Sequence, residues 1–197
     1  APRTAEGSAR IGPNAILQLV PVLDRTSGRA TRARLLAAGG FDAVPDASAM
    51  IDEGAVARVH QALRAAFPKT AAALGWAAGT RTGDYIRINR IPRPAQAVLR
   101  ALPRTLATRL LARAIAKHAW TFAGSGRFSI VGHRPLTVEI ADNPVVRGER
   151  AATPVCHWHA AVFERLFRTL VDPNLRCREV ACCAAGAPAC RFVIDRP

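Results

Sequence analysis

The chain has 197 residues, of which 50% are hydrophobic and 21% are charged, and this is enough apolar material for one core. We therefore expect residues 1–197 to form a single domain. Arginine interrupts every apolar run before it reaches the roughly 18 residues needed to cross a bilayer. The N-terminal stretch "APRTAEGSARIG" lacks the apolar core of a signal peptide, so the sequence predicts a cytoplasmic protein without transmembrane segments.

The formal net charge of +14 comes almost wholly from arginine, since Lys69 and Lys117 are the only lysines. A basic surface can attract nucleic acid, anionic lipid or a small acid. The basic residues are scattered singly, and the chain has no helix-turn-helix, RNA-recognition or zinc-finger spacing. We therefore expect no nucleic-acid partner and leave peripheral membrane contact open. A solvated, arginine-rich surface is the simpler interpretation.

Residues 1–122 have mainly helical patterns. The stretch 14–25 places Asn14 as an N-cap and Pro21 as a kink, and the stretch 52–67 begins with acidic residues that suit a helix N-terminus. The clearest helix is expected over 106–122. Its apolar stripe contains Leu111, Ile115, His118 and Phe122, and its basic stripe contains Arg109, Arg113 and Lys117.

Residues 123–197 change to a period of two. "RFSIVG" and "LTVEIA" read as a hairpin around "HRP", and "VCHWHAAVFERLFRTLV" reads as a helix. Two further strands, "CREVACCAA" and "ACRFVID", flank the turn "GAP". The sequence therefore predicts an α+β fold, in which the N-terminal helices pack on an antiparallel sheet with the order ββαββ.

The cysteines gather near the C-terminus. An odd count of five in a reducing compartment argues against a disulfide framework and leaves metal binding, redox chemistry or simple burial. In the last hairpin Cys182 and Cys190 can face each other, with Glu179 one or two strand positions away and Cys156 at the start of the preceding helix. Three thiolates and a carboxylate can form a closed, structural zinc site. Burial as small hydrophobes is the alternative.

Several segments together resemble a known family. "LLARAIAKHAW", "GSGRFSI", "VCHWHAAVFERLF" and the E-x-x-C-x-x-x-G-x-x-x-C-x-F pattern in "EVACCAAGAPACRFVI" are similar to the 4-vinyl-reductase-type small-molecule-binding domain. This domain also occurs in phenol-sensing bacterial regulators and is akin to vesicle-tethering subunits. The resemblance implies a structural zinc ion, whose ligands would be Cys156, Glu179, Cys182 and Cys190.

The N-terminal segments "EGSARIGPNAILQLVPVL" and "GTRTGDYIRINRIPRPAQAVLRALP" extend this resemblance to the bacteriochlorophyll-biosynthesis members of the family. It implies a magnesium tetrapyrrole ligand and either a carrier or chaperone role or the reduction of a vinyl group. It also implies other enzymes of the pathway as partners, and a homodimer is open. A ligand-sensing regulator, the third class, would need an attached ATPase or DNA-binding domain.

Vinyl reduction requires a hydride or electron source. The chain has no G-x-G-x-x-G after a strand, because "GSG" at 124–126 leads into a strand and lacks the third glycine. We therefore expect no NAD or flavin site. The favoured interpretation is a tetrapyrrole-binding protein, and the alternative is a vinyl reductase that uses an external donor.

A tetrapyrrole carrier needs an apolar slot, a neutral donor for the magnesium ion and cations for the carboxylates. We expect the macrocycle to lie between the helix of His118 and the concave side of the sheet. The histidines expected to face inward are His60, His118 and His159, with His118 ranked first, although each also suits a core position. The other candidate binding residues are Trp120, Phe122, Arg113 and Lys117.

Overall fold

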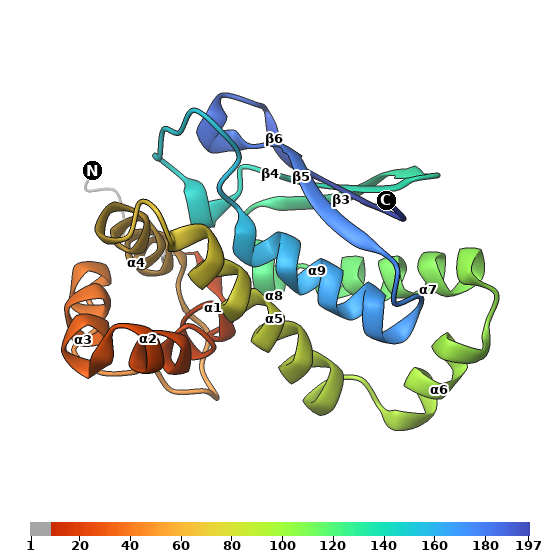
Figure 1. Ribbon diagram of the computed structural model, residues 1–197, viewed down its shortest axis with the longest axis horizontal. Helices are drawn as coiled ribbons and strands as arrows, with labels where there is room; N and C mark the ends of the chain where they lie inside the picture. The colour runs from red at the N-terminus through yellow and green to blue at the C-terminus, as the bar shows by residue number, and fades with distance from the viewer. Residues whose placement is uncertain (1–8) are drawn as a thin grey trace, which may run out of the picture.

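The computed structural model describes residues 9–197, in which helices pack against one face of an antiparallel sheet (Figure 1). The sheet order is β3-β4-β6-β5, and every neighbouring pair is antiparallel. The strands are β3 (Arg127–His133), β4 (Leu136–Ala141), β5 (Arg176–Ala181) and β6 (Ala189–Asp195), and helix α9 (His157–Leu170) lies between β4 and β5 in the chain. The predicted α+β class and the ββαββ order are confirmed.

The N-terminal part is helical, apart from a small ladder of two strands, β1 (Arg10–Ile11) and β2 (Ile51–Asp52). Its helices are α1 (Asn14–Leu17), α2 (Val20–Thr26), α3 (Gly28–Gly39), α4 (Glu53–Ala66), α5 (Ala71–Asn89), α6 (Arg93–Ala101), α7 (Arg104–Lys117) and α8 (Trp120–Ala123). Two short 3-10 turns, η1 (Pro144–Val146) and η2 (Cys183–Ala185), complete the C-terminal part.

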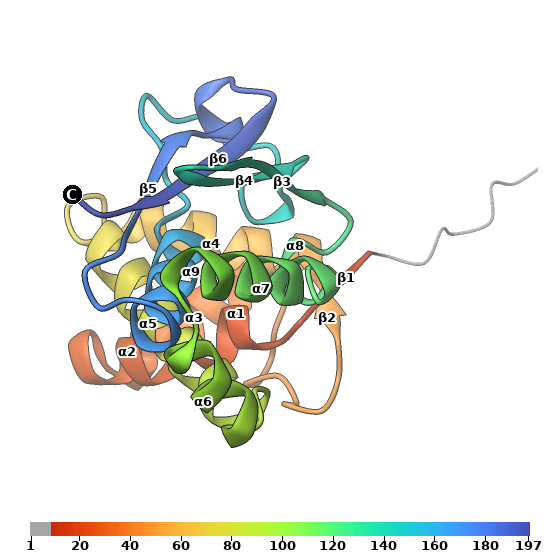
Figure 2. The ribbon, with the colours of Figure 1, turned by 90° about the vertical axis from the view of Figure 1, so that its right-hand side faces the viewer.

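The core lies between the sheet and α9. Along β4 the side chains of Leu136, Val138 and Ile140 are buried and alternate with more exposed ones, as expected for a sheet covered on one face. Phe163 of α9 meets Phe192 of β6 edge to face, with ring centroids 5.3 Å apart. Figure 2 shows α9 and α7 side by side beneath the sheet.

Helix α9 is also buried on the side that faces away from the sheet, because α5 packs closely along it. At Gly79 of α5 an added Cβ atom would lie only 2.3 Å from the backbone oxygen of Trp158. This close approach encloses Glu164, which is 8% exposed and which we had placed on the outer side of its helix. Its Oε2 accepts a hydrogen bond of 2.9 Å from the Cys177 backbone N–H.

Two of the predicted helices are broken. The expected helix over 14–25 divides into α1 and α2, and Pro21 sits in the first turn of α2, so the predicted kink is a break. The expected helix over 106–122 ends at Lys117 and resumes as α8. At the break, the His118 N–H bonds to the oxygen of Ile115, three residues earlier, over 3.0 Å. This tighter turn ends the 3.6-residue period that the inward position of His118 required.

No helix in residues 9–197 is long and apolar enough to cross a membrane. Most of the N-terminal stretch that lacks a signal-peptide core, residues 1–8, lies outside the described residues.

Candidate metal centre

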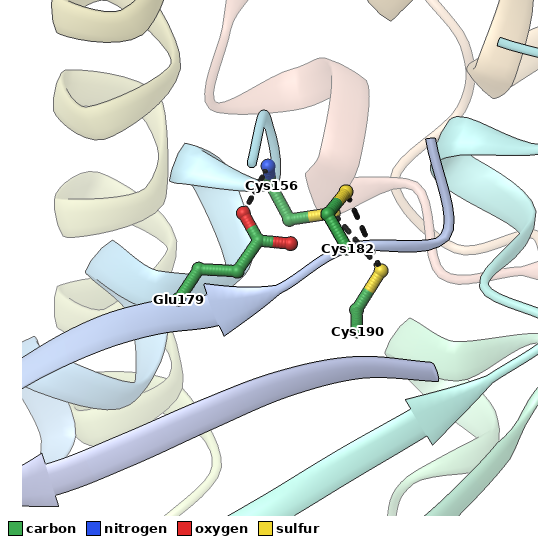
Figure 3. Close-up of side chains that lie close together, drawn as sticks. All are labelled: Cys156, Glu179, Cys182 and Cys190. Carbon is green, nitrogen blue, oxygen red and sulfur yellow. Dashed lines mark hydrogen bonds between the residues drawn. The ribbon is translucent and has the colours of Figure 1, made fainter. Parts of the chain in front are cut away.

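Four side chains from three elements meet at one end of the sheet (Figure 3). Cys156 is the N-cap residue of α9, Glu179 lies on β5, Cys182 follows that strand and Cys190 lies on β6. The Sγ atom of Cys156 is 3.8 Å from that of Cys182 and 3.5 Å from that of Cys190, and the last two are 3.8 Å apart. All four residues that the sequence predicted are therefore brought together. We call them the metal centre.

Glu179 contributes one oxygen to the fold and leaves the other free. Its Oε2 accepts a hydrogen bond of 2.7 Å from the Cys156 backbone N–H and thereby caps the start of α9. Its Oε1 is buried and has no hydrogen-bond partner among the described residues. A buried carboxylate oxygen without a partner is costly, so this atom is suited to a cation.

The protonation of the metal centre shows how strongly its groups interact. Hydrogen bonds from Cys156 and then Cys190 lower the pKa of the Cys182 thiol, while hydrogen bonding to Cys182 and Cys190 raises the pKa of Cys156. Burial, followed by the nearby Cys182, raises the pKa of Glu179 to about 8. The four groups cannot easily all be anionic together, and a bound cation would relieve this repulsion.

The geometry suits a tetrahedral ion. Thiolates about 2.3 Å from a tetrahedral zinc ion lie about 3.8 Å from one another, which is the spacing of these sulfurs. All four ligand atoms lie within 4.8 Å of one another. Three sulfurs and a carboxylate oxygen form a closed donor set, so the metal centre can hold a metal ion.

Two groups that sequence reasoning did not predict contact the sulfurs. The buried Asn143 side chain donates from Nδ2 to Cys156 Sγ over 3.4 Å, and the Cys183 backbone N–H donates to Cys190 Sγ over 3.3 Å. Such contacts orient metal ligands and stabilise thiolates. Asn143 lies 13 residues before Cys156 in a loop, and no spacing rule points to it. We had expected strand alternation to turn Cys183 away, but the strand has ended there and η2 has begun.

The predicted binding histidines separate into buried and exposed positions. His60 and His159 are each 1% exposed, as predicted. Burial, reinforced for His60 by the nearby Arg64, lowers the pKa of His60 to about 3 and that of His159 to about 4. Both side chains are neutral at pH 7. His118 is exposed, so the prediction that it faces inward is wrong.

His159 lies in an aromatic layer between α9 and the sheet. Its Nε2 is 3.2 Å from the backbone oxygen of Phe122, and its Nδ1 is buried without a partner among the described residues. The ring of Phe122 packs edge to face against Phe128 and Phe163, with centroids 5.5 and 5.7 Å away. These rings fill the space in which we had expected the macrocycle.

The other predicted binding residues lie at the surface. Trp120 is 57% exposed, and Arg113 and Lys117 are exposed on α7. The structure therefore does not bring them together with His60 and His159. A small cavity of about 10 Å³, about the size of one water molecule, lies between His60, His159 and Cys156.

Comparison with known proteins identifies the relatives of this chain. Residues 136–196, which include the whole metal centre, match the model of the domain family named after 4-vinyl reductase. The chain is 58% identical, over 93% of its own length and 89% of the relative, to the bacteriochlorophyll synthase 23 kDa chain of Cereibacter sphaeroides. It is 50% identical to the protein of the same name from Rhodobacter capsulatus, over 98% of this chain and 91% of that one.

Solved structures share the fold at low sequence identity. An iron(II) H-NOX protein from K. algicida superposes with a TM-score of 0.62 at 10% identity, covering 95% of this chain and 97% of that one. The phenol-responsive sensory domain of the transcription activator PoxR, solved with phenol, superposes with a TM-score of 0.50 at 15% identity, covering 74% and 75%. The sequence identities, which are far higher for the two 23 kDa chains, show that this chain belongs to the family of the bacteriochlorophyll synthase 23 kDa chain and contains a domain of the 4-vinyl-reductase type.

Proposed function

We propose that this protein binds a magnesium tetrapyrrole of bacteriochlorophyll biosynthesis and delivers it to an enzyme of that pathway. The observation that carries the proposal is the 58% identity to a protein named as one chain of bacteriochlorophyll synthase. That name also supports other biosynthetic enzymes as partners. The fold is shared with a sensory domain solved with phenol and with an iron(II) H-NOX protein, which supports small-molecule binding.

We further propose that the metal centre holds zinc in a structural role. Zinc favours thiolate ligands in tetrahedral geometry, and the sulfur spacing and the unpartnered Glu179 Oε1 both fit such an ion. Three of the four ligands lie within or beside the hairpin of β5 and β6, and Cys156 begins α9. The ion would therefore join the helix to the sheet. Four protein ligands leave no open position for substrate, so the zinc would not be catalytic.

For the tetrapyrrole we propose entry between α8 and strand β3. Helix α8 has four residues, follows the break at His118 and ends at Gly124, whose φ of +54° favours glycine. It is the shortest element that covers His159. Movement of α8 would withdraw Phe122 from the aromatic layer and release the Nε2 of His159 from the Phe122 oxygen.

His159 then becomes the preferred donor to the magnesium ion, in place of His118. A magnesium ion held by four macrocycle nitrogens can accept one axial imidazole, which must be neutral, and His159 is neutral and buried. His118, Trp120, Arg113 and Lys117 lie outside the layer, where the two cations could meet the pigment carboxylates at the entrance. His60 is held by the backbone oxygen of Ala15 over 3.1 Å and suits a core role.

The experiment titrates the purified, zinc-loaded protein with a divinyl magnesium porphyrin and records absorption spectra with and without reduced nicotinamide. A saturable band shift without a change in the vinyl groups supports a carrier. Formation of the ethyl product by this protein and reduced nicotinamide alone would overturn the carrier proposal in favour of a vinyl reductase. An unchanged spectrum at every concentration would overturn pigment binding itself.

Single alanine substitutions locate the donor, with a thermal melt of each variant as the control for folding. We expect His159→Ala to lose pigment affinity by at least about tenfold more than His118→Ala, because only His159 faces the layer behind α8. His60→Ala should lower the melting temperature and leave the affinity unchanged. Equal affinity in all three variants would contradict an axial histidine.

A further inference from the structure

The positive charge of this chain is concentrated in one segment. Residues 85–138 contain ten arginine or lysine residues and no aspartate or glutamate, whereas the rest of the chain contains eighteen basic and fourteen acidic residues. This segment includes all of α6, α7 and α8. Figure 2 shows α6 and α7 at the front of the molecule, on the face opposite to α3. The scattered charges of the sequence therefore form a basic side in the fold.

The exposed side of α7 combines this charge with large apolar side chains. Leu106 and Leu110, one turn apart, are 50% and 48% exposed. Arg109, Arg113 and Lys117 are exposed and lie at neighbouring helical positions, three or four residues from one another or from a leucine. The opposite side of the helix is buried through Ala107, Leu111 and Ala112. We call the five exposed residues the α7 surface.

The cations of the α7 surface are not used within the fold. Arg109, Arg113 and Lys117 form no salt bridge with any residue of 9–197, although other arginines do, such as Arg104, which lies 3.6 Å from Asp172. Exposed leucines are not stabilised by water, and unpaired cations flanking them repel one another. Neither feature stabilises this protein alone, so both together indicate a partner that is anionic and has an apolar interior.

We propose that the α7 surface docks this protein on a bilayer that contains anionic lipid. A helix with leucines between basic residues can lie in the plane of the membrane interface, with the leucines in the acyl boundary and the cations at the headgroups. Trp120, 57% exposed just after α7, is a residue type that favours that interface. The attachment is peripheral, and it does not depend on the proposed tetrapyrrole.

A bilayer fits these residues better than a nucleic acid. Nucleic acid neutralises cations equally well, but it offers no apolar phase for Leu106 and Leu110, and the surfaces that bind single strands use aromatic side chains for stacking. The α7 surface itself contains no aromatic residue. RNA is therefore the competing partner that the experiment must include.

The test is flotation of the full chain with vesicles of phosphatidylcholine alone and of phosphatidylcholine mixed with phosphatidylglycerol. We expect binding to the mixed vesicles only, weakened by added salt. The variant R109Q/R113Q/K117Q should bind roughly a hundredfold more weakly, because each basic side chain near an anionic surface contributes a factor of about five. Its matched control is R25Q/R29Q/R34Q, which removes three exposed arginines of α2 and α3 and should bind like the wild type.

A second variant tests the apolar part. L106S/L110S should lower vesicle binding about tenfold without changing the net charge, because burial of a half-exposed leucine side chain contributes about a factor of three or more. Val44→Ser, at another exposed apolar position, should have no effect. Far-UV circular dichroism and a thermal melt check that each variant is folded.

Three outcomes would overturn the proposal. Equal binding to neutral vesicles would remove the role of charge, and an equal loss in both triple variants would show general electrostatics without a surface. If RNA binds more tightly than mixed vesicles and binding is insensitive to L106S/L110S, the α7 surface is a nucleic-acid site. Because no pigment is present, these results are independent of the proposed carrier role.

Discussion

Buried, neutral histidines make a specific prediction about acid stability. His60 and His159 are both 1% exposed, and burial is the main cause that lowers their pKa to about 3 and about 4. In the unfolded chain both return to about 6.5. A base whose pKa is depressed by folding contributes stability above its unfolded pKa and loses that stability as the pH falls toward the folded pKa. The stability of this protein should therefore decline below about pH 6.5.

The size of the effect follows from the two pKa values. Between pH 7 and pH 5 an unfolded histidine takes up almost one proton, while a folded one with a pKa of about 3 or 4 takes up almost none. Each histidine should then lower the free energy of unfolding by about 2 kcal/mol over this range, and the two together by about 4 kcal/mol. The carboxylates Glu53 and Asp172, whose pKa values are lowered, act below this window.

The assay is urea unfolding of the zinc-loaded protein at pH 7, 6 and 5, followed by tryptophan fluorescence. His60→Gln should reduce the decline between pH 7 and pH 5 by about 2 kcal/mol relative to the wild type, because one of the two histidines is gone. Contributions from all other groups, the metal centre included, cancel in this difference. His118→Gln, at an exposed position, controls for the substitution itself. Parallel curves for wild type and His60→Gln would refute the argument from burial.

Further predictions concern the metal centre and the packing. Cys182→Ser should lower zinc content and thermal stability together, and Cys183→Ser should change zinc content less, as measured by metal analysis and melting. Gly79→Ala should destabilise the fold by about 1–3 kcal/mol, because its Cβ would lie 2.3 Å from a backbone oxygen of α9. Gly75→Ala on the same helix, whose Cβ would have its nearest contact at 3.6 Å, should instead be neutral or stabilising in urea unfolding. Glu53→Gln should cost about 1–3 kcal/mol, because its buried carboxylate bonds to two groups of a serine and to an arginine.

The C-terminal half could be predicted because its signals are local. Strand alternation places Leu136, Val138 and Ile140 on one face, and the same alternation brings Cys190 of β6 opposite Ile140 of β4. The hairpin of β5 and β6 needs only a short turn, so Cys182 and Cys190 must lie close together. The start of α9 was predicted at Cys156, which is its N-cap residue.

The helical half was harder because its signals are not local. Helix α5 has few large apolar residues, and its glycines, which normally argue against a helix, serve the close contact with α9 at Gly79. The position of His118 depended on a helix continuing through 106–122, and one tightened turn was enough to expose it. Asn143 reaches Cys156 from a loop, a contact that only the tertiary fold determines.

The arrangement of fixed and free elements links the metal centre to the proposed ligand site. The metal centre ties the start of α9 to β5 and β6, and the close contact at Gly79 holds the other side of α9 against α5. The helix that carries His159 is therefore held on two sides. What can move next to it is α8, because it has four residues and is bounded by a tightened turn and by Gly124. Since α8 directly follows α7, a bilayer bound at the α7 surface would lie close to the element that opens. A hydrophobic pigment would then pass between membrane and protein without crossing much water, and a rigid α9 would hold the donor in place as it enters.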